Sequence, residues 1–282
     1  MSIRCVVLDL DGTLTDVPRE SPPFVEAFPA LVSDLLGRDL GASWAAAERA
    51  VHARSPELGW LIEGHMVGPA DADPYILASS AAQIVFDEAG VLARDASLRS
   101  EITTTIFRRA YHRTTTAFRP EAKEVLEALL ARLPTVYVVT NAATEVATRK
   151  LAELAPEGLE RLRIRGDAGK FMIGPPSRPD PRFAAIPREK RLPGLARPVL
   201  LERGRYFDAL AAIWAESGAG PESTLVCGDI FELDLALPAE LGAHVHLVER
   251  ETTYRYERDA VHALGARGGV SEGLTALLER LS

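Results

Sequence analysis

The stretch CVVLDLDGT occupies residues 5–13 and decides the fold of this chain. Its first four residues are all apolar, which is typical of a short strand buried on both faces of a parallel sheet. Asp9 and Asp11 follow directly, and Gly12 permits a tight turn that the hydroxyl of Thr13 can fix. Open α/β sheets bind ligands at the carboxyl ends of their strands, so we expect a functional site at these two carboxylates.

Three further strand-like runs continue the pattern that the strand at residues 4–8 begins. They cover residues 135–139, 224–227 and 243–248. A helix is predicted between the first two strands, over residues 120–133, because its apolar side chains recur every three to four positions. Strands that alternate with helices predict an α/β fold, in which helices cover both faces of a doubly wound, Rossmann-like parallel sheet.

About a third of the chain, after the first strand, has little strand character and several amphipathic stretches. We therefore expect a helical insert between the first strand and Pro120, with the rest of the chain forming the α/β core. Residues 166–198 contain seven prolines and should be irregular, as a rim of the site or a contact surface. Ser271 is predicted to cap a last helix.

Composition and charge narrow the classes of function. The chain has 282 residues, of which 47% are hydrophobic and 26% charged, enough for a substantial core. A formal net charge of -8 argues against a nucleic-acid-binding surface, which needs clustered Lys and Arg. No run approaches the roughly 18 apolar residues of a membrane helix, and no secretory signal begins the chain. We therefore expect a cytoplasmic protein with neither nucleic acid nor membrane as a partner.

Two later strands also end in polar residues. Thr140 and Asn141 follow the strand at residues 135–139, and a hydroxyl and an amide N–H there can hold phosphoryl oxygens. Asp229 follows the strand at residues 224–227, and Asp234 comes five residues later. Because the carboxyl ends of parallel strands meet at one edge of a sheet, these side chains should lie near the carboxylates of the first strand.

The motifs D-x-D-G-T, a strand-terminal Thr-Asn and G-D-x-x-x-x-D occur here in this order. In this combination the chain resembles the haloacid dehalogenase superfamily, whose motifs I, II and IV they match. The resemblance covers residues 1–15 and 118–282, and it implies that residues 16–117 are a helical cap. It also implies a magnesium-dependent phosphomonoester hydrolase that forms an aspartyl-phosphate and acts on a small phosphorylated metabolite.

The resemblance implies a catalytic role for four of these residues. Asp9 would attack phosphorus and carry the phosphoryl group as an aspartyl-phosphate. Asp11 would protonate the leaving oxygen and then deprotonate the attacking water. Thr140 and the Asn141 N–H would hold the transferring group.

The resemblance also implies a magnesium site. The Asp9 carboxylate, the Asp11 carbonyl and Asp229 would hold the ion, and Asp234 would support it. The ion is needed because a carboxylate can approach a phosphate dianion only when their repulsion is neutralised.

Motif III is where the sequence departs from the family pattern. Related proteins often carry K-P-x-P-x-x-F before the motif IV strand, whereas residues 201–207 read LERGRYF and contain no lysine. Lys170 is the best replacement, because it follows a probable further strand that ends before Gly166, and related proteins also place this lysine after that strand. Arg203 is the second candidate and Lys190 the third. Arg203 is also a candidate for substrate binding. We predict that the Lys170 ammonium lies within about 4 Å of Asp9 or Asp229.

Three other functions compete with this interpretation of the sequence. A phosphosugar mutase of the same superfamily would keep both carboxylates of motif I, so the sequence leaves it open. Dehalogenases generally lack the second one, because halide leaves without a proton, and Asp11 is present here. A module that binds magnesium and phosphate without turnover is supported only by the displaced cation of motif III.

Overall fold

The computed structural model describes residues 2–281, and internal contacts divide it into two compact units. Unit 1 comprises Met1–Asp16 and Phe118–Ser282, and unit 2 comprises Val17–Ala117. The first boundary lies one residue later than the sequence placed it. Each unit has a hydrophobic core of its own.

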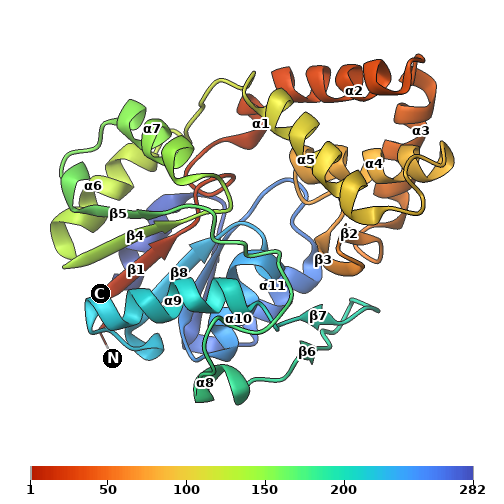
Figure 1. Cartoon of the computed structure of the whole chain (residues 1–282). Coiled ribbons are helices and arrows are strands. Elements are labelled where there is room, and N and C mark those ends of the chain that lie inside the picture. The colour runs from red at the N-terminus through yellow and green to blue at the C-terminus, as the bar shows by residue number, and fades with distance from the viewer. Residues whose placement is uncertain (1, 282) are drawn as a thin grey trace. The chain divides into compact units, whose positions relative to one another are not determined.

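Unit 1 is built on a six-stranded sheet with the order β10-β9-β8-β1-β4-β5 (Figure 1). All five pairs of neighbouring strands are parallel, and Leu8 of β1 is in register with Val138 of β4 and Cys227 of β8. The carboxyl ends of these three central strands therefore meet at one edge, and the predicted doubly wound α/β fold is confirmed. The strands are β1 (Cys5–Leu8), β4 (Thr135–Val139), β5 (Leu162–Arg165), β8 (Thr224–Gly228), β9 (His244–Val248) and β10 (Gly268–Ser271).

Alternate residues of each strand enter two separate cores, one on each face of the sheet. Val6 and Leu8 pack in the core that includes α6, α7 and the C-terminal 3₁₀-helix, whereas Cys5 and Val7 pack in the core that includes α9, α10 and α11. These helices are α6 (Ala122–Arg132), α7 (Thr144–Leu154), α9 (Gly204–Ser217), α10 (Ala236–Glu240), α11 (Arg255–His262) and the 3₁₀-helix Leu274–Leu281.

The C-terminal part of unit 1 differs from the sequence prediction. Ser271 does not cap a helix, because it is the last residue of β10, and its Oγ donates to the Gly273 carbonyl over 2.7 Å. The last helix begins only at Leu274 and has 3₁₀ geometry. The glycines 268 and 269 concealed this strand, because glycine is depleted in strands.

The proline-rich segment forms only short elements. It contains α8 (Pro181–Ala184) and β6 (Glu189–Lys190), which pairs antiparallel with β7 (Val199–Leu200) just beyond it. The segment contains no long helix and no central strand, as predicted. A short 3₁₀-helix, Leu159–Arg161, precedes β5, two more (Pro221–Ser223 and Gly265–Arg267) precede β8 and β10, and a π-helical turn, Phe231–Leu235, follows β8.

Unit 2 is mainly helical but contains a β-hairpin that the sequence analysis missed. Strands β2 (Gly59–Ile62) and β3 (His65–Pro69) pair antiparallel around Glu63 and Gly64. Both turn residues have positive φ, of 49° and 82°, as a tight two-residue hairpin turn requires. The helices are α1 (Val17–Glu20), α2 (Pro22–Leu36), α3 (Gly41–Arg54), α4 (Pro74–Glu88) and α5 (Ala96–Tyr111).

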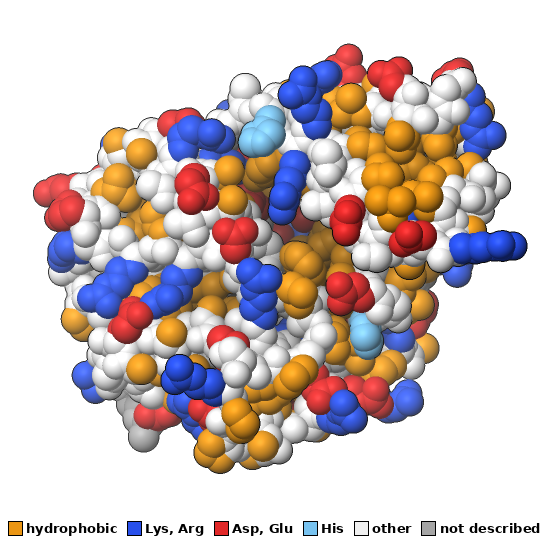
Figure 2. All heavy atoms as spheres, in the orientation of Figure 1, with side chains coloured by type: hydrophobic (Ala, Val, Ile, Leu, Met, Phe, Trp, Pro, Cys, Tyr) orange, Lys and Arg blue, Asp and Glu red, His pale blue; other side chains and the backbone are white. Residues whose placement is uncertain are grey.

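The surface carries charges of both signs. Figure 2 shows Lys and Arg side chains interspersed with Asp and Glu over one face. The net charge of -8 is therefore not gathered into one field on that face. Among residues 2–281, none of the helices is both long enough and apolar enough to cross a membrane.

Candidate active site

Asp9 lies at the carboxyl end of β1, in the middle of the sheet. Its backbone N–H donates to the Cys227 carbonyl over 2.9 Å, which continues the pairing of β1 with β8 by one residue. Thr13 Oγ1 donates to Asp9 Oδ2 over 3.3 Å. The Asp9 side chain is only 10% exposed. Asp9 is therefore fixed in direction, and only a small part of it is open to a ligand.

Lys170 reaches Asp9 from the loop after β5. Its Nζ lies 2.6 Å from Asp9 Oδ1 and 2.8 Å from Asp234 Oδ1, and the Lys170 side chain is 1% exposed. The distance predicted between Lys170 and Asp9 is therefore confirmed. The ammonium also lies 5.6 Å from the centre of the Tyr206 ring, a cation–π contact. One buried cation thus joins the carboxylates that follow β1 and β8.

Three buried carboxylates gather at these strand ends. Asp9, Asp229 and Asp234 each offer one oxygen, and these oxygens lie within 4.8 Å of one another. Gly12 permits this approach, because a Cβ built on it would lie 2.4 Å from Asp229 Oδ2. Clustered carboxylate oxygens are the donors that hard divalent cations such as Mg²⁺ prefer, so the residues fit such an ion.

Burial and neighbouring charges shift the pKa values of the groups in this cluster. The pKa of Asp9 is raised to about 7, mainly because burial disfavours its charged form. The Lys170 ammonium lowers this pKa, whereas the neighbouring Asp234 carboxylate raises it. Burial disfavours the Lys170 ammonium, yet Asp234 and Asp9 together raise the pKa of Lys170 above its ordinary value. The Lys170 ammonium is therefore stabilised by two carboxylates, those of Asp9 and Asp234.

Asp11 contacts a buried lysine that the sequence analysis did not identify. Lys150 Nζ lies 2.8 Å from Asp11 Oδ1, and the two side chains are 3% and 23% exposed. Lys150 lies on the buried face of α7 together with Ala147 and Leu151. A lysine on the apolar face of an amphipathic helix was the signal that could have identified it.

Thr140 and Asn141 follow β4, next to the loop that carries Lys170. Thr140 is 1% exposed, and its Oγ1 accepts a hydrogen bond from the Ala142 N–H over 3.1 Å. Asn141 Oδ1 accepts from the Lys170 N–H over 2.8 Å. The structure thus brings both residues to the edge where Asp9 lies, and the contact of Asn141 with the lysine loop was not predicted.

The other two candidates for the motif III cation lie elsewhere. Arg203 is completely buried, and its guanidinium donates to the carbonyls of Lys170 and Leu200. Lys190 forms an ion pair with Glu240 and is 39% exposed. Lys170 is therefore the candidate that contacts the Asp9 carboxylate.

Two buried ion pairs flank the loop after β8. Arg250 pairs with Glu257 over 2.8 Å and also donates to the Asp229 carbonyl. Arg197 pairs with Glu232 over 2.7 Å. Both glutamates are completely buried. These pairs could not be predicted from the sequence, because no local pattern shows which distant charged residues will meet.

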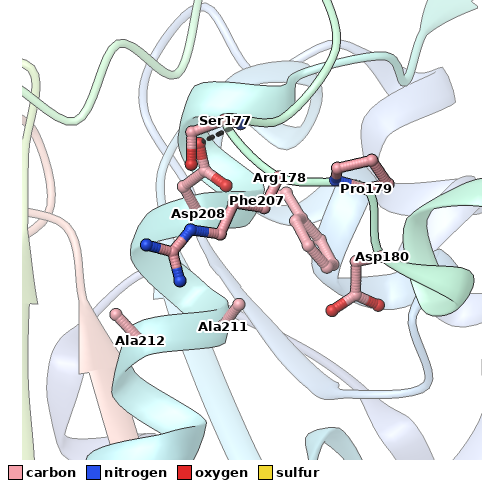
Figure 3. Close-up of a pocket in the computed structure, with 8 residues that line it drawn as sticks. All are labelled: Ser177, Arg178, Pro179, Asp180, Phe207, Asp208, Ala211 and Ala212. Carbon is pink, nitrogen blue, oxygen red and sulfur yellow. Dashed lines mark hydrogen bonds between the residues drawn. The ribbon is translucent and has the colours of Figure 1, made fainter.

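A pocket of about 500 Å³ lies elsewhere on unit 1, between α9 and the proline-rich segment (Figure 3). Asp208 accepts a hydrogen bond there from the Ser177 N–H over 2.8 Å. Its lining contains none of the residues predicted for catalysis, so we place the candidate site at the strand ends. The lining residues are Ser177, Arg178, Pro179, Asp180, Phe207, Asp208, Ala211 and Ala212.

Solved structures share this fold over nearly the whole chain. A predicted phosphoglycolate phosphatase from Haemophilus somnus 129PT is 14% identical, with a TM-score of 0.56, and the match covers 100% of this chain and 99% of that one. A protein described as the HAD-hydrolase YfnB from Bacillus subtilis, bound to magnesium, is 14% identical, with a TM-score of 0.50 and coverage of 94% and 100%. A protein assigned as a β-phosphoglucomutase from Thermotoga maritima is 12% identical, with a TM-score of 0.52 and coverage of 99% and 98%.

The family model of haloacid dehalogenase-like hydrolases matches residues 3–182. This range is more than half of the chain and includes Asp9, Thr140 and Lys170. Among curated proteins, none matches this chain. The match over residues 3–182, together with a parallel sheet that brings Asp9 and Lys170 into contact, shows that the chain belongs to the haloacid dehalogenase-like hydrolases.

Proposed function

We propose that this protein is a magnesium-dependent phosphomonoester hydrolase that forms an aspartyl-phosphate on Asp9 and acts on a small phosphorylated metabolite in the cytoplasm. The observation that carries the proposal is the buried cluster of Asp9, Asp229 and Asp234 with the Lys170 ammonium on two of the three carboxylates. An ordinary solvated turn would leave such carboxylates exposed and unpaired. Their burial around one cation favours a site for a charged ligand.

The donor set supports magnesium as the cofactor. The Asp9 carboxylate, the Asp11 carbonyl and Asp229 would hold the ion, with Asp234 in support, and these are hard oxygen donors. When bound, the ion would neutralise the repulsion between the Asp9 carboxylate and the phosphate. The close approach of three carboxylate oxygens supports this assignment, and so does the magnesium-bound state of the Bacillus subtilis relative.

Hydrolysis would proceed in two displacements at phosphorus. In the first, an Asp9 oxygen forms a bond to phosphorus, the bond to the leaving oxygen breaks, and Asp11 gives that oxygen a proton. In the second, a water oxygen attacks phosphorus, Asp11 takes the proton from the water, and the bond to Asp9 breaks. Asp11 is better placed for this exchange than Asp9, because its side chain is 23% exposed.

Lys170 and the residues after β4 would hold the phosphoryl oxygens. A lysine ammonium has three N–H donors, and the bonds to Asp9 and Asp234 use two of them, which leaves one for a substrate oxygen. The Thr140 hydroxyl accepts from Ala142, so its own proton can be donated. With the Asn141 N–H, these donors would stabilise the charge that develops during transfer.

A phosphosugar mutase is the second candidate function. It is favoured by the likeness of the fold to the protein assigned as a β-phosphoglucomutase from Thermotoga maritima. A mutase returns the phosphoryl group to another hydroxyl of the sugar, whereas a hydrolase releases one inorganic phosphate for each substrate consumed. Measurement of released phosphate with a set of sugar phosphates separates the two.

The experiment that tests the proposal is hydrolysis of p-nitrophenyl phosphate by the purified full-length chain. A chelator should abolish turnover and added Mg²⁺ should restore it. Asp9→Asn should lose on the order of a thousandfold or more, because a carboxamide cannot form the covalent intermediate. Turnover that persists undiminished in chelator rules out the magnesium mechanism.

Asp259→Asn is the matched control for Asp9→Asn. Asp259 makes an ion pair on the surface of α11 and is 52% exposed, so the same change of charge there should leave turnover within about twofold of wild type. Circular dichroism checks that both variants fold. An Asp9→Asn variant that folds and keeps activity within about tenfold of wild type excludes Asp9 as the nucleophile. The absence of any turnover in the wild-type chain would favour a module that binds without catalysis.

A further inference from the structure

Arg203 is completely buried just before the start of α9. Its Nε donates to the Leu200 carbonyl over 3.0 Å and its Nη1 to the Lys170 carbonyl over 2.5 Å. Burial lowers the pKa of Arg203 to about 10, so enclosing this charge is unfavourable. Apolar side chains often replace buried ions without loss of stability. Packing alone therefore does not explain why an arginine, rather than an apolar residue, occupies this buried position.

Lys170 depends on side chains for its position. It lies in an irregular loop after β5, where no neighbouring strand holds its backbone. Asn141 Oδ1 accepts from the Lys170 N–H over 2.8 Å, and Arg203 donates to the Lys170 carbonyl. The backbone of Lys170 is thus fixed on both sides, by one side chain from β4's carboxyl end and one from the start of α9.

Arg203 is itself held against the segment that follows Lys170. The Gly174 N–H donates to the Glu202 carbonyl over 2.7 Å, and the Gly204 N–H donates to the Gly174 carbonyl over 3.0 Å. A Cβ built on Gly204 would lie 2.1 Å from the Pro175 carbonyl carbon, so only glycine permits this approach. The backbone that carries Arg203 is therefore fixed relative to the lysine loop.

We propose that Arg203 is a positioning residue that acts through Lys170. By fixing the Lys170 carbonyl, it sets the base of the side chain whose ammonium contacts Asp9 and Asp234. An ammonium on a flexible four-carbon stem stays between two carboxylates more readily when its backbone cannot move. Arg203 has no exposed surface, so it does not touch substrate. The proposal rests on the proposed function, because it affects turnover only if Lys170 takes part there.

A double-mutant cycle tests this inference in the full-length chain. Arg203→Met keeps the apolar volume and removes the guanidinium, and it should lower kcat for p-nitrophenyl phosphate by about 10- to 100-fold. The KM should change less than kcat, because the phosphate still binds. In a Lys170→Met background, Arg203→Met should change kcat by no more than about twofold, because the residue through which Arg203 acts is gone.

The Lys170 background separates a positioning role from a merely structural one. An equal loss of kcat with and without Lys170 would show that Arg203 acts independently of it, and the proposal would be wrong. A wild-type kcat in Arg203→Met would overturn it as well. Arg188→Met is the matched control, because Arg188 is 83% exposed and pairs with Glu202, next to Arg203 in the sequence. It should keep kcat within about twofold of wild type.

A structural measurement decides the inference without turnover. Crystal structures of the wild type and of Arg203→Met should show the Lys170 Nζ moving from 2.6 Å to beyond about 4 Å from Asp9 Oδ1. An unchanged distance in the variant contradicts the proposal. If Arg203→Met does not fold, the same double-mutant cycle is made with Arg203→Lys. A lysine ammonium cannot bond to the Leu200 and Lys170 carbonyls with the geometry of a guanidinium. A wild-type chain without turnover would refute the proposed function, while the crystal structures would still decide the role of Arg203.

Discussion

At the scale of single residues, Gly12 determines how closely motif I approaches Asp229. Its φ is +89°, and a Cβ there would lie 2.4 Å from Asp229 Oδ2. We predict that Gly12→Ala displaces the Asp229 carboxylate and weakens Mg²⁺ binding by about tenfold or more. Isothermal titration calorimetry measures the affinity.

Gly218→Ala is the control for Gly12→Ala. Gly218 also has a positive φ, of 63°, but nothing lies within 4 Å of the Cβ position. Both substitutions therefore introduce a similar backbone strain, of about 1 kcal/mol. Only Gly12→Ala should also weaken Mg²⁺ binding. Equal Mg²⁺ affinities in the two variants would show that the contact with Asp229 does not matter.

The pH dependence of Mg²⁺ binding should report on Asp9. Burial raises the pKa of Asp9 in the metal-free protein to about 7, and Mg²⁺ binds only the deprotonated carboxylate. The Mg²⁺ affinity should therefore be highest above about pH 7, where Asp9 is deprotonated. We predict that it falls by about tenfold for each pH unit below about pH 7, because a proton competes with the metal for the carboxylate. Calorimetric titrations between about pH 5.5 and about pH 8.5 test this, and a constant affinity over that range would contradict it.

The carboxylates could be predicted from the sequence, but the environment of the cation could not. Asp9 and Asp229 each follow a buried strand, so a local pattern was sufficient to bring them together. Lys170 lies in an irregular loop, Lys190 in a two-residue strand and Arg203 just before α9, where the direction of a side chain depends on contacts with distant residues. The sequence could therefore rank these three cations, and only the structure showed that Lys170 contacts Asp9 while Arg203 contacts the carbonyl of Lys170.

At the scale of elements, α6 anchors the sheet on the face opposite α9. Leu126 is completely buried in the core that contains Val6 and Val136. We predict that Leu126→Ala lowers the free energy of unfolding by about 2–5 kcal/mol through a cavity. Lys123→Ala, at an exposed position of the same helix, should change the free energy of unfolding by no more than about 0.5 kcal/mol. Urea denaturation measures both, and similar values for the two would contradict this account of α6.

The central elements could be predicted because their patterns are strong. The run at residues 135–139 matches β4 at both ends, since its mostly apolar residues are bounded by Pro134 and Thr140. The hairpin of unit 2 was missed because its strands are short and contain Gly59 and Gly68, although the pair Glu63-Gly64 was a turn signal.

At the scale of the whole molecule, the division of the chain into two units could be predicted from a change of pattern. No strand of the six-stranded sheet lies between β1, which ends at Leu8, and β4, which begins at Thr135, and the helices between them form a core of their own. The ion pairs that link distant segments could not be predicted in this way. Arg197 and Glu232, for example, are 35 residues apart, and each is surrounded in sequence by residues that give no sign of the other.

The central claim for the molecule is that Asp9 is phosphorylated during turnover. The measurement that tests it most directly is chemical trapping of the intermediate. The protein is mixed with Mg²⁺ and p-nitrophenyl phosphate, quenched in acid and reduced with borohydride, which converts an acyl phosphate to an alcohol, and the modified peptide is identified by mass spectrometry. Our account predicts homoserine at position 9 and none at Asp11, Asp229 or Asp234. Modification of another residue, or turnover that leaves Asp9 unmodified while a known aspartyl-phosphate enzyme is trapped under the same conditions, would contradict it.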